Sequence, residues 1–295
     1  MNYVTAAAFR TALERRLLDR SRETGMSLVR LRKSVVFDRL LARLLAVAPG
    51  RWVLKGALAL DYRLGPGTRT TKDVDLGRTD DEDGATSDFV KAQAADLGDY
   101  FVFVVRRTDR LNQLQEGAAV RYSVDCQLAG RQFEAVTVDI AFGDPIVGVP
   151  ERLRGPDLLA FADIAPVEVP AVRLSQHIAE KVHAYARVYG EQGIQSTRVK
   201  DLVDLVLIAE AAEVDAAELR VALERTFEGR GIRALPAELP SAPEAWRVPY
   251  RRMARDIGLS PELEAAHIAA AEFLNPVLSR RVRSGTWEPA SRSWQ

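Results

Sequence analysis

The sequence has few of the residues that form cross-links and transition-metal sites. Cys126 is the single cysteine among 295 residues, so an internal disulfide framework and a zinc site built from cysteines are both excluded. There are three histidines, which argues against a histidine-rich metal site. Carboxylates would therefore have to hold any metal ion that the protein binds.

Net charge and long apolar segments are absent as well. The chain has 41 Lys and Arg against 41 Asp and Glu, so its net charge is zero and contact with nucleic acid must come from local basic patches. No stretch approaches the ~20 apolar residues of a membrane-spanning helix. The N-terminus also has no secretory signal pattern. We expect a soluble, cytoplasmic protein without membrane contact.

What the sequence does contain is an ordinary globular composition, with 47% hydrophobic residues and a length that suits two domains. In the first half, helical and strand patterns of hydrophobic residues follow one another. We predict helices at 5–48 (divided at Gly25), 56–64 and 88–97, and strands at 52–54, 73–76, 100–105, 118–128 and 132–141. The last two strands flank Ala129-Gly130, a turn of the hairpin type.

A connector with several prolines and glycines follows at 145–170, and the rest of the chain is helical almost to its end. The predicted helices lie at 173–189, 197–211, 216–226, 245–256 and 261–273. The polar residues 284–295 are expected to be frayed. We thus predict a mixed α/β domain with N-terminal helices at 1–165 and a helical domain at 166–295.

Two aspartates on one predicted strand give the strongest chemical signal. Asp73 and Asp75 point to the same face because side chains alternate along a strand, and they would repel each other without a cation. Oxygen ligands of this kind suit Mg²⁺, which commonly binds substrate phosphates as well. An isolated Asp-x-Asp pattern is more often a polar-faced edge strand with solvated side chains, so its neighbours decide between the two interpretations.

Those neighbours favour phosphate chemistry. Gly56 lies between a short strand and a helix, so its backbone N–H and the helix N-terminus can bind a phosphate group. Asp139 lies on another predicted strand. A glycine turn, a strand with two aspartates and a later strand with a third form the arrangement used in two-metal phosphoryl transfer.

Three stretches in this order resemble the AbiEii-type toxin family of the nucleotidyltransferase superfamily. They are Leu54–Leu60 with Arg69–Asp75, then Ile178–Ala184, then Arg198–Leu205. The resemblance implies the toxin of a type IV toxin–antitoxin system. It also implies an α/β (α+β) fold, in which a nucleotidyltransferase-like mixed β-sheet domain is followed by a helical C-terminal domain that completes the active-site cleft. Ala57 departs from the family pattern, where relatives usually have a second glycine or a serine.

The resemblance also implies roles for individual residues. Asp73, Asp75 and Asp139 would hold Mg²⁺ in a two-metal site, and Asp139 would be the base for the attacking hydroxyl. Catalytic roles are implied for Asp73, Asp75, Asp139, Lys181, Asp201 and Asp204. Contacts with the NTP are implied for Lys55, Gly56, Ala57, Thr71, Lys72, Lys181 and Lys200.

The residues of the second half also have simpler interpretations, which stay open. Lys181 can reach a phosphate, or it can form a solvated surface pair with Glu180 while His183 packs at the edge of the core. Asp201 and Asp204 share one helical face. That face is either a wall of the cleft or an exposed polar stripe near a helix N-terminus.

Arginines are unevenly distributed despite the zero net charge. They are dense between residues 10 and 43, and they recur at Arg251, Arg252 and Arg255 with helical spacing. Such clusters are either solvated helix faces or a surface that binds RNA phosphates without reading the sequence. The acidic run at 80–83 is expected to be a solvated loop.

Taken together, these patterns predict an Mg²⁺-dependent nucleotidyltransferase. The resemblance implies that it transfers a nucleoside monophosphate from an NTP to a hydroxyl at the 3′ acceptor end of tRNA, which would block aminoacylation and translation. Its protein partner would be a cognate antitoxin. Two alternatives remain, namely a nucleotidyltransferase that acts on a protein or small molecule, and a catalytically inactive module that binds RNA or a partner.

Overall fold

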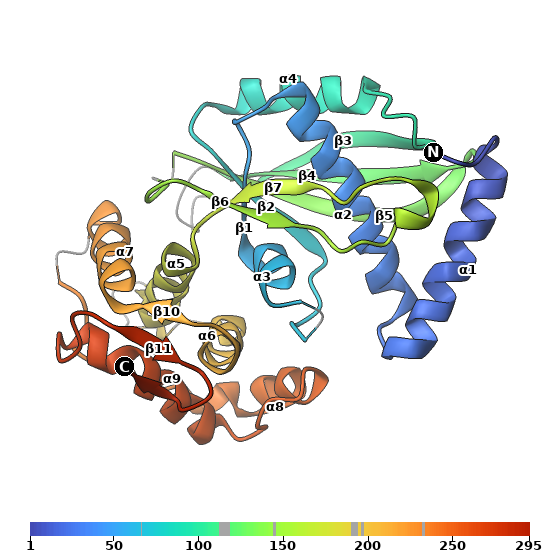
Figure 1. The fold of residues 1–295 in the computed structure, drawn as a ribbon. Helices are drawn as coiled ribbons and strands as arrows, with labels where there is room; N and C mark the ends of the chain where they lie inside the picture. The colour runs from blue at the N-terminus through green and yellow to red at the C-terminus, as the bar shows by residue number, and fades with distance from the viewer. Residues whose placement is uncertain (66, 112–118, 144–145, 190–193, 196–197, 232–233) are drawn as a thin grey trace. The chain divides into compact units, whose positions relative to one another are not determined.

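The chain forms two compact units, shown in Figure 1. The structure is a computed structural model that describes residues 1–65, 67–111, 119–143, 146–189, 194–195, 198–231 and 234–295. The first unit consists of Met1–Arg63, Thr70–Ile146 and Pro150–Ala171. The second consists of Leu64–Arg69, Val147–Val149 and Val172–Gln295. Each unit has its own helices and its own sheet.

The N-terminal helices divide where the sequence predicts. Helix α1 (Ala6–Thr24) starts after Thr5, whose hydroxyl accepts a hydrogen bond from the backbone N–H of Ala8. It ends at Gly25, which has a φ of 72° in the left-handed region that glycine adopts without strain. Helix α2 (Leu28–Val47) follows directly. The predicted break at Gly25 is therefore confirmed.

A seven-stranded mixed sheet forms the centre of the first unit, in the order β3-β4-β5-β2-β1-β7-β6. Its strands are β1 (Val53–Lys55), β2 (Asp73–Arg78), β3 (Phe101–Leu111), β4 (Ala119–Leu128), β5 (Arg131–Phe142), β6 (Glu151–Arg154) and β7 (Glu168–Ala171). Helix α3 (Gly56–Leu64) follows β1 without a loop, and α4 (Glu82–Ala94) follows β2. The predicted α/β fold class is confirmed.

The two faces of the sheet differ in chemistry. On one face, apolar side chains are fully buried in the core that includes residues of α2 and α4, as at Val74, Leu76, Val138 and Ile140. Side chains alternate along a strand, so Asp75 and Asp139 lie on the opposite face. The alternation predicted from the sequence therefore separates the core from the candidate site.

The sheet excludes one alternative interpretation of the sequence and corrects one prediction. Strand β2 pairs with β5 on one side and β1 on the other, so it is not an edge strand. The expected connector at 145–170 contains β6 and β7, which extend the sheet beyond β1. Each of these strands has four residues, too few for a hydrophobic period to stand out from a loop.

The acidic run at 80–83 is also not a solvated loop. Asp80 binds the buried guanidinium of Arg78, with a distance of 2.6 Å from Nε to Oδ1. Asp81 caps α4, because its side chain accepts a hydrogen bond from Gly84 N at 2.9 Å. The next two acidic residues lie in the first turn of α4, where the helix dipole favours negative charge.

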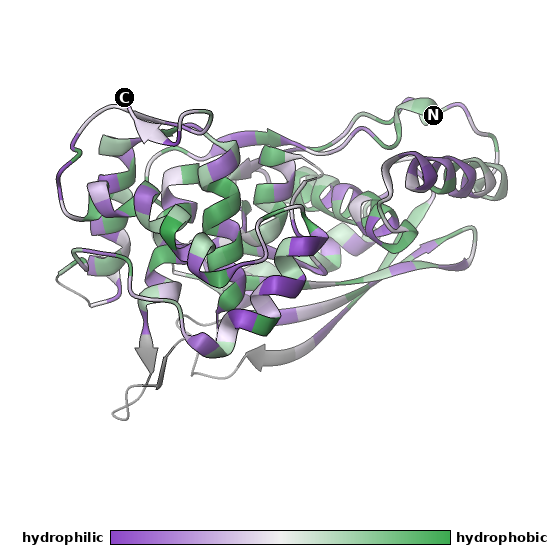
Figure 2. Ribbon diagram, turned by 90° about the horizontal axis from the view of Figure 1, so that it is seen from below, coloured by the Kyte–Doolittle hydropathy of each residue, from purple (hydrophilic) through white to green (hydrophobic). Residues whose placement is uncertain are grey.

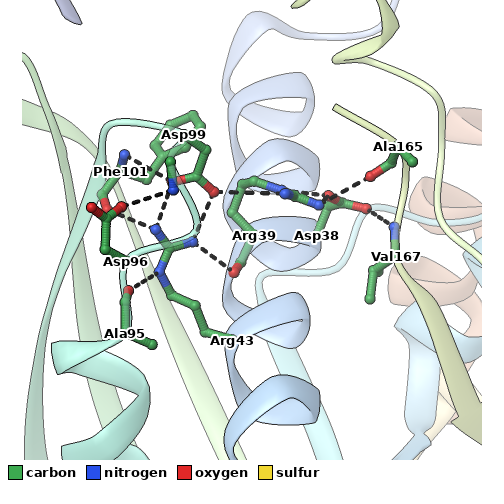
Figure 3. Close-up of polar contacts among 10 residues, drawn as sticks. Asp38, Arg39, Arg43, Ala95, Asp96, Asp99, Phe101, Ala165 and Val167 are labelled. Carbon is green, nitrogen blue, oxygen red and sulfur yellow. Dashed lines mark hydrogen bonds and ion pairs between the residues drawn. The ribbon is translucent and has the colours of Figure 1, made fainter. Parts of the chain in front are cut away.

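Helix α2 carries buried ion pairs, which Figure 3 shows. Arg43 is fully buried and donates to both oxygens of Asp99 at 2.9 and 2.6 Å. Arg39 binds Asp38, whose other oxygen accepts from Val167 N at 2.7 Å. Burial raises the pKa of Asp38, although Arg39 opposes this shift. Two arginines of the predicted RNA-binding cluster are therefore internal, and the hypothesis that they lie on a basic surface was wrong.

The second unit is mainly helical, as predicted. It contains α5 (Leu174–Ala186), α6 (Val199–Ala211), α7 (Ala216–Gly229), α8 (Arg247–Asp256) and α9 (Leu263–Leu278), with a small hairpin of β8 (Val188–Tyr189) and β9 (Ile194–Gln195). Figure 2 shows hydrophobic and hydrophilic residues side by side along the helices. Within the described residues, no helix combines the length and apolarity needed to cross a membrane.

The C-terminal residues are folded rather than frayed. Strands β11 (Thr286–Glu288) and β12 (Ser293–Trp294) form a three-stranded sheet with β10 (Val214–Asp215). Trp287 is buried against Phe273, and its Nε1 donates to Ala209 O at 2.8 Å. The polar composition of 284–295 misled the prediction because two tryptophans, Trp287 and Trp294, pack on Phe273.

Candidate active site

The turn between β1 and α3 brings the backbone against Asp75. Gly56 has a φ of +63°, in the region that L side chains rarely adopt. A Cβ atom at this position would lie 1.8 Å from Oδ2 of Asp75, so a side chain is also excluded by space. The glycine turn and the Asp-x-Asp strand, found separately in the sequence, form one local structure.

Four charged residues form a row across the sheet. Asp75 on β2 lies opposite Lys55 on β1 and opposite Asp139 on β5. Asp139 in turn lies opposite Arg121 on β4. Residues that are directly opposite share a face of the sheet, so the order of the row is Lys55, Asp75, Asp139, Arg121. A positive residue lies at each end of the row, and the two aspartates lie between them. Asp73 lies on the same face, two residues before Asp75.

Arg121 and Asp139 form a bidentate ion pair within this row. The guanidinium donates from Nε and Nη2 to the two oxygens of Asp139, both at 2.7 Å. These hydrogen bonds, with the attraction of Asp139, Asp73 and Asp75, raise the pKa of Arg121 although burial opposes the shift. The three aspartates and Arg121 therefore belong to one electrostatic environment.

The sequence did not predict Arg121 as a site residue, because its position opposite Asp139 depends on a β-bulge. The register at the hairpin turn would place it opposite Val138, a residue of the apolar face. Phe133 is skipped in the pairing of β4 with β5, so the register shifts by one residue and Arg121 lies opposite Asp139. The sequence signals the turn, but it does not signal this shift.

The donor set suits a hard divalent cation at Asp73 and Asp75. Carboxylate oxygens on one face of a strand are the ligands that Mg²⁺ prefers. Within the part of the chain that the structure describes, however, no three acidic, histidine or cysteine side chains form a ready metal cluster. Both oxygens of Asp139 are bonded to Arg121, so the role of Asp139 as a metal ligand stays a prediction.

The other predicted nucleotide contacts of the first unit surround the same turn. Ala57 is buried in the first turn of α3, and Lys55 is buried at the end of β1. The Thr71 hydroxyl donates to Asp73 O at 3.0 Å, so it holds the start of β2. Lys72 is exposed next to Asp73. Their contacts with a nucleotide stay predictions.

The remaining predicted site residues lie in the second unit, where they form a buried ion cluster. Lys181 on α5 donates to Asp204 Oδ2 at 2.5 Å and to Asp201 Oδ1 at 3.2 Å, both on α6. Arg69 binds both oxygens of Asp204 at 2.8 and 2.9 Å. Arg198 donates to Asp201 at 2.8 Å. The surface pair of Lys181 with Glu180 and the exposed aspartate stripe were therefore wrong.

Electrostatics stabilises the charged forms in this cluster. Burial lowers the pKa of Lys181, but Asp204 and Asp201 outweigh it and the pKa lies above its usual value. Burial raises the pKa of Asp204, but Lys181 and Arg69 outweigh that effect and the pKa lies below its usual value. It stays a prediction that this cluster and the exposed Lys200 contribute to a nucleotide-binding cleft.

The predicted basic patches are only partly available for RNA. On α1, Arg15, Arg16 and Arg20 are exposed, although Arg15 pairs with Asp19 at 3.0 Å. Figure 2 shows that hydrophilic residues cover much of this helix beside the N-terminus. On α8, Arg252 and Arg255 are exposed and Arg251 is half-buried.

A strand, a glycine turn at a helix N-terminus and an adjacent strand with Asp-x-Asp define a nucleotidyltransferase type of site. The comparison with known families agrees with this class. The profile described as "Nucleotidyl transferase AbiEii toxin, Type IV TA system" matches residues 39–274, so the chain belongs to the AbiEii family of nucleotidyltransferase toxins. No curated protein matches the sequence significantly.

Two solved structures are similar to this chain at low sequence identity. MenT4, a nucleotidyltransferase toxin from Mycobacterium tuberculosis H37Rv, is similar with a TM-score of 0.51 and 20% identity, over 93% of this chain and 99% of MenT4. JHP933 from Helicobacter pylori is similar with a TM-score of 0.45 and 13% identity, over 84% of this chain and 94% of JHP933. The likeness to MenT4 supports the fold, and the family match supports the class.

Proposed function

We propose that this protein, in the cytoplasm, transfers a nucleoside monophosphate from an NTP to the 3′-terminal hydroxyl of tRNA and releases pyrophosphate. The added nucleotide would block aminoacylation and thereby translation, and a cognate antitoxin would oppose this activity. The observation that carries the proposal is the position of Asp75 against the Gly56 turn, with Asp139 beside it in register. The family match supports a transferase and a toxin–antitoxin context.

The residues of the first unit would divide the work as follows. The backbone of the Gly56 turn and the N-terminus of α3 would bind triphosphate oxygens. Asp73 and Asp75 would hold Mg²⁺, whose charge stabilises the charge that develops on the transferring phosphoryl group. Asp139 would accept the proton of the attacking hydroxyl. Lys55 and Lys72 would add positive charge near the phosphates.

The residues of the second unit would contribute a second set of charges. Lys181 would meet the triphosphate, together with Lys200, while Asp201 and Asp204 hold Lys181 in place. Arg69 adds a further positive charge to this cluster, where it binds both oxygens of Asp204.

Labelled NTPs, Mg²⁺ and total RNA test the proposal with the wild-type protein. We expect label on tRNA, and we expect the Asp73→Ala and Asp75→Ala variants to lose it by several orders of magnitude. The thermal stability of Asp73→Ala should be unchanged or higher, because the loss of one carboxylate relieves repulsion. Asp83→Ala is a matched control, since Asp83 is exposed on α4, and it should keep full activity.

The other outcomes contradict the proposal in distinct ways. Label on a protein or a small molecule would replace tRNA as the acceptor. Absence of any label with all four NTPs would favour a catalytically inactive module that binds RNA or a partner. Full activity of either aspartate variant would remove the site from the first unit.

A further inference from the structure

The pairing of Asp139 is at odds with the work assigned to it. A carboxylate can bind a metal ion or accept a proton only through an oxygen lone pair that is available. Both oxygens of Asp139 accept charge-assisted hydrogen bonds from Arg121 at 2.7 Å, the bidentate geometry that makes such pairs strong. This pair occupies one lone pair on each oxygen and places a positive charge beside the carboxylate, so a cation or a proton must compete with Arg121 for Asp139.

The exposure and position of Arg121 allow it to exchange partners. Its side chain is 39% exposed, whereas the side chain of Asp139 is 19% exposed, so the guanidinium can turn towards solvent while the carboxylate stays at the sheet. Arg121 also lies on the same face as Asp73 and Asp75, which makes the proposed phosphate site a nearby alternative. Guanidinium groups bind phosphate with the same paired donors that they use for carboxylates.

We propose that Arg121 is a positioning residue that holds Asp139 in reserve. In the free protein, Arg121 pairs with Asp139 and lowers the affinity of the site for divalent cations. When the NTP and its cation bind, Arg121 transfers its hydrogen bonds from Asp139 to phosphate oxygens, which leaves the carboxylate for the cation or the hydroxyl. This inference rests on the proposed function of the same site, and it adds an order of events to it.

Mn²⁺ titration by electron paramagnetic resonance, without nucleotide, tests the first half of the proposal. Arg121→Ala should bind Mn²⁺ about tenfold more tightly than the wild type, because Asp139 loses its bidentate partner and becomes available to the cation. Arg121→Lys keeps the charge but not the bidentate pair, so its affinity should lie between the two. Equal affinity in wild type and Arg121→Ala would overturn the proposal.

Arg106→Ala is the matched control for this titration. Arg106 lies on the neighbouring strand β3 and pairs with Asp125 at 3.8 Å, with 70% of its side chain exposed. The Arg106→Ala substitution also removes one positive charge and one cross-strand ion pair from this sheet. Its Mn²⁺ affinity should equal that of the wild type. A gain as large as in Arg121→Ala would show a general charge effect and overturn the proposal.

A double variant separates the release of Asp139 from the plain loss of charge. In the Asp139→Asn background, Arg121→Ala should add little Mn²⁺ affinity, because the carboxylate held in reserve is already gone. An undiminished tenfold gain in that background would contradict the role of Asp139. Melting temperatures of all variants identify any that fail to fold, and Arg121→Lys then stands in for Arg121→Ala.

Binding of a non-hydrolysable NTP analogue in the presence of Mg²⁺ tests the second half. Arg121→Ala should bind the analogue about tenfold more weakly and raise KM more than it lowers kcat, since a phosphate contact is lost. Unchanged analogue affinity would overturn the exchange. The Mn²⁺ titration needs no transfer activity, so a wild type that labels nothing would refute the proposed function while the titration still decides the role of Arg121.

Discussion

Gly56 shows how much of the site depends on a single residue. Its positive φ and the 1.8 Å approach of a built Cβ to Asp75 are two separate requirements for glycine. The first concerns the backbone, and the second concerns the carboxylate that the proposal assigns to the metal. A substitution here should therefore damage both the turn and the metal site.

We expect Gly56→Ala to reduce nucleotidyl transfer by at least about 100-fold, because the new methyl group displaces the Asp75 carboxylate. Gly25→Ala is the control, since Gly25 has a φ of +72° but open space around a Cβ. Both variants should lose about 1 kcal/mol in unfolding experiments for the left-handed backbone. Normal transfer by Gly56→Ala would separate the turn from the chemistry.

Lys181 is a second residue whose environment changes its expected behaviour. It is buried between two aspartates, so Lys181→Ala leaves negative charge in the interior. We expect a loss of about 3–5 kcal/mol in the free energy of unfolding, measured with urea. Lys200→Ala, an exposed change on the neighbouring α6, should cost less than about 0.5 kcal/mol. A loss of under about 1 kcal/mol for Lys181→Ala would contradict the buried cluster.

The lowered pKa of Asp204 predicts a loss of stability in acid. In the unfolded chain this group has an ordinary pKa of about 3.9, above its folded value, so the unfolded state binds more protons as the pH falls. The stabilising contribution is complete above that pH and is lost as the pH falls through the folded pKa. Urea unfolding between about pH 2 and pH 6 should therefore show a shallower acid decline for Asp204→Asn than for the wild type. Parallel curves would show that Asp204 is not the cause.

At the scale of elements, short strands made the largest difference between expectation and structure. Strands β6, β7, β11 and β12 have two to four residues each, yet they extend one sheet and complete another. Two of them join strands that are distant in sequence, because β7 pairs with β1 and β11 pairs with β10. A stretch of two to four residues is too short to show a hydrophobic period that would identify it as a strand.

The C-terminal sheet gives a direct test of this element. We expect Trp287→Ala to lower the free energy of unfolding by about 3–5 kcal/mol, because a buried indole and its hydrogen bond to Ala209 are lost. Val248→Ala removes an apolar side chain that is 75% exposed, and it should change stability by under about 0.5 kcal/mol. A neutral Trp287→Ala variant would mean that the C-terminus is frayed in solution.

At the scale of the whole molecule, the zero net charge means that the proposed binding of tRNA depends on local basic patches, and two arginine groups are candidates. One group lies on α1 in the first unit and the other on α8 in the second. Several other arginines of the first fifty residues are engaged within the first unit, as Arg43 is with Asp99. The two groups are therefore tested one at a time.

We expect tRNA affinity to fall with salt, with each phosphate contact contributing about −0.7 to −0.9 to the slope of log K against log salt. Charge reversal at Arg15, Arg16 and Arg20, or at Arg251, Arg252 and Arg255, should lower the affinity and flatten the slope. Arg225→Glu, an exposed change on α7, is the control. NTP binding should be unchanged in all three. Identical slopes in the wild type and both triple variants would remove these arginines from the docking surface.

The sequence by itself determined the longer helices, most strands of the sheet and the family. Amphipathic periodicity, caps such as Thr5 and Gly25, and the Asp-x-Asp alternation are local properties, so they can be read from adjacent residues. The sequence also predicted that the Gly56 turn and the strand of Asp73 and Asp75 are neighbours, because a strand, a tight turn and the next strand lie close together in the chain.

Only the tertiary structure decided which charges meet. A bulge at Phe133 shifts the register of β4 against β5 and so sets Arg121 opposite Asp139. The cluster around Lys181 joins residues of α5 and α6 with Arg69, which lies more than a hundred residues earlier in the chain. The hydrophobic pattern of a sequence does not show whether such charged side chains lie in water or in the protein interior. Their partners follow from the packing of distant segments, which no local pattern records.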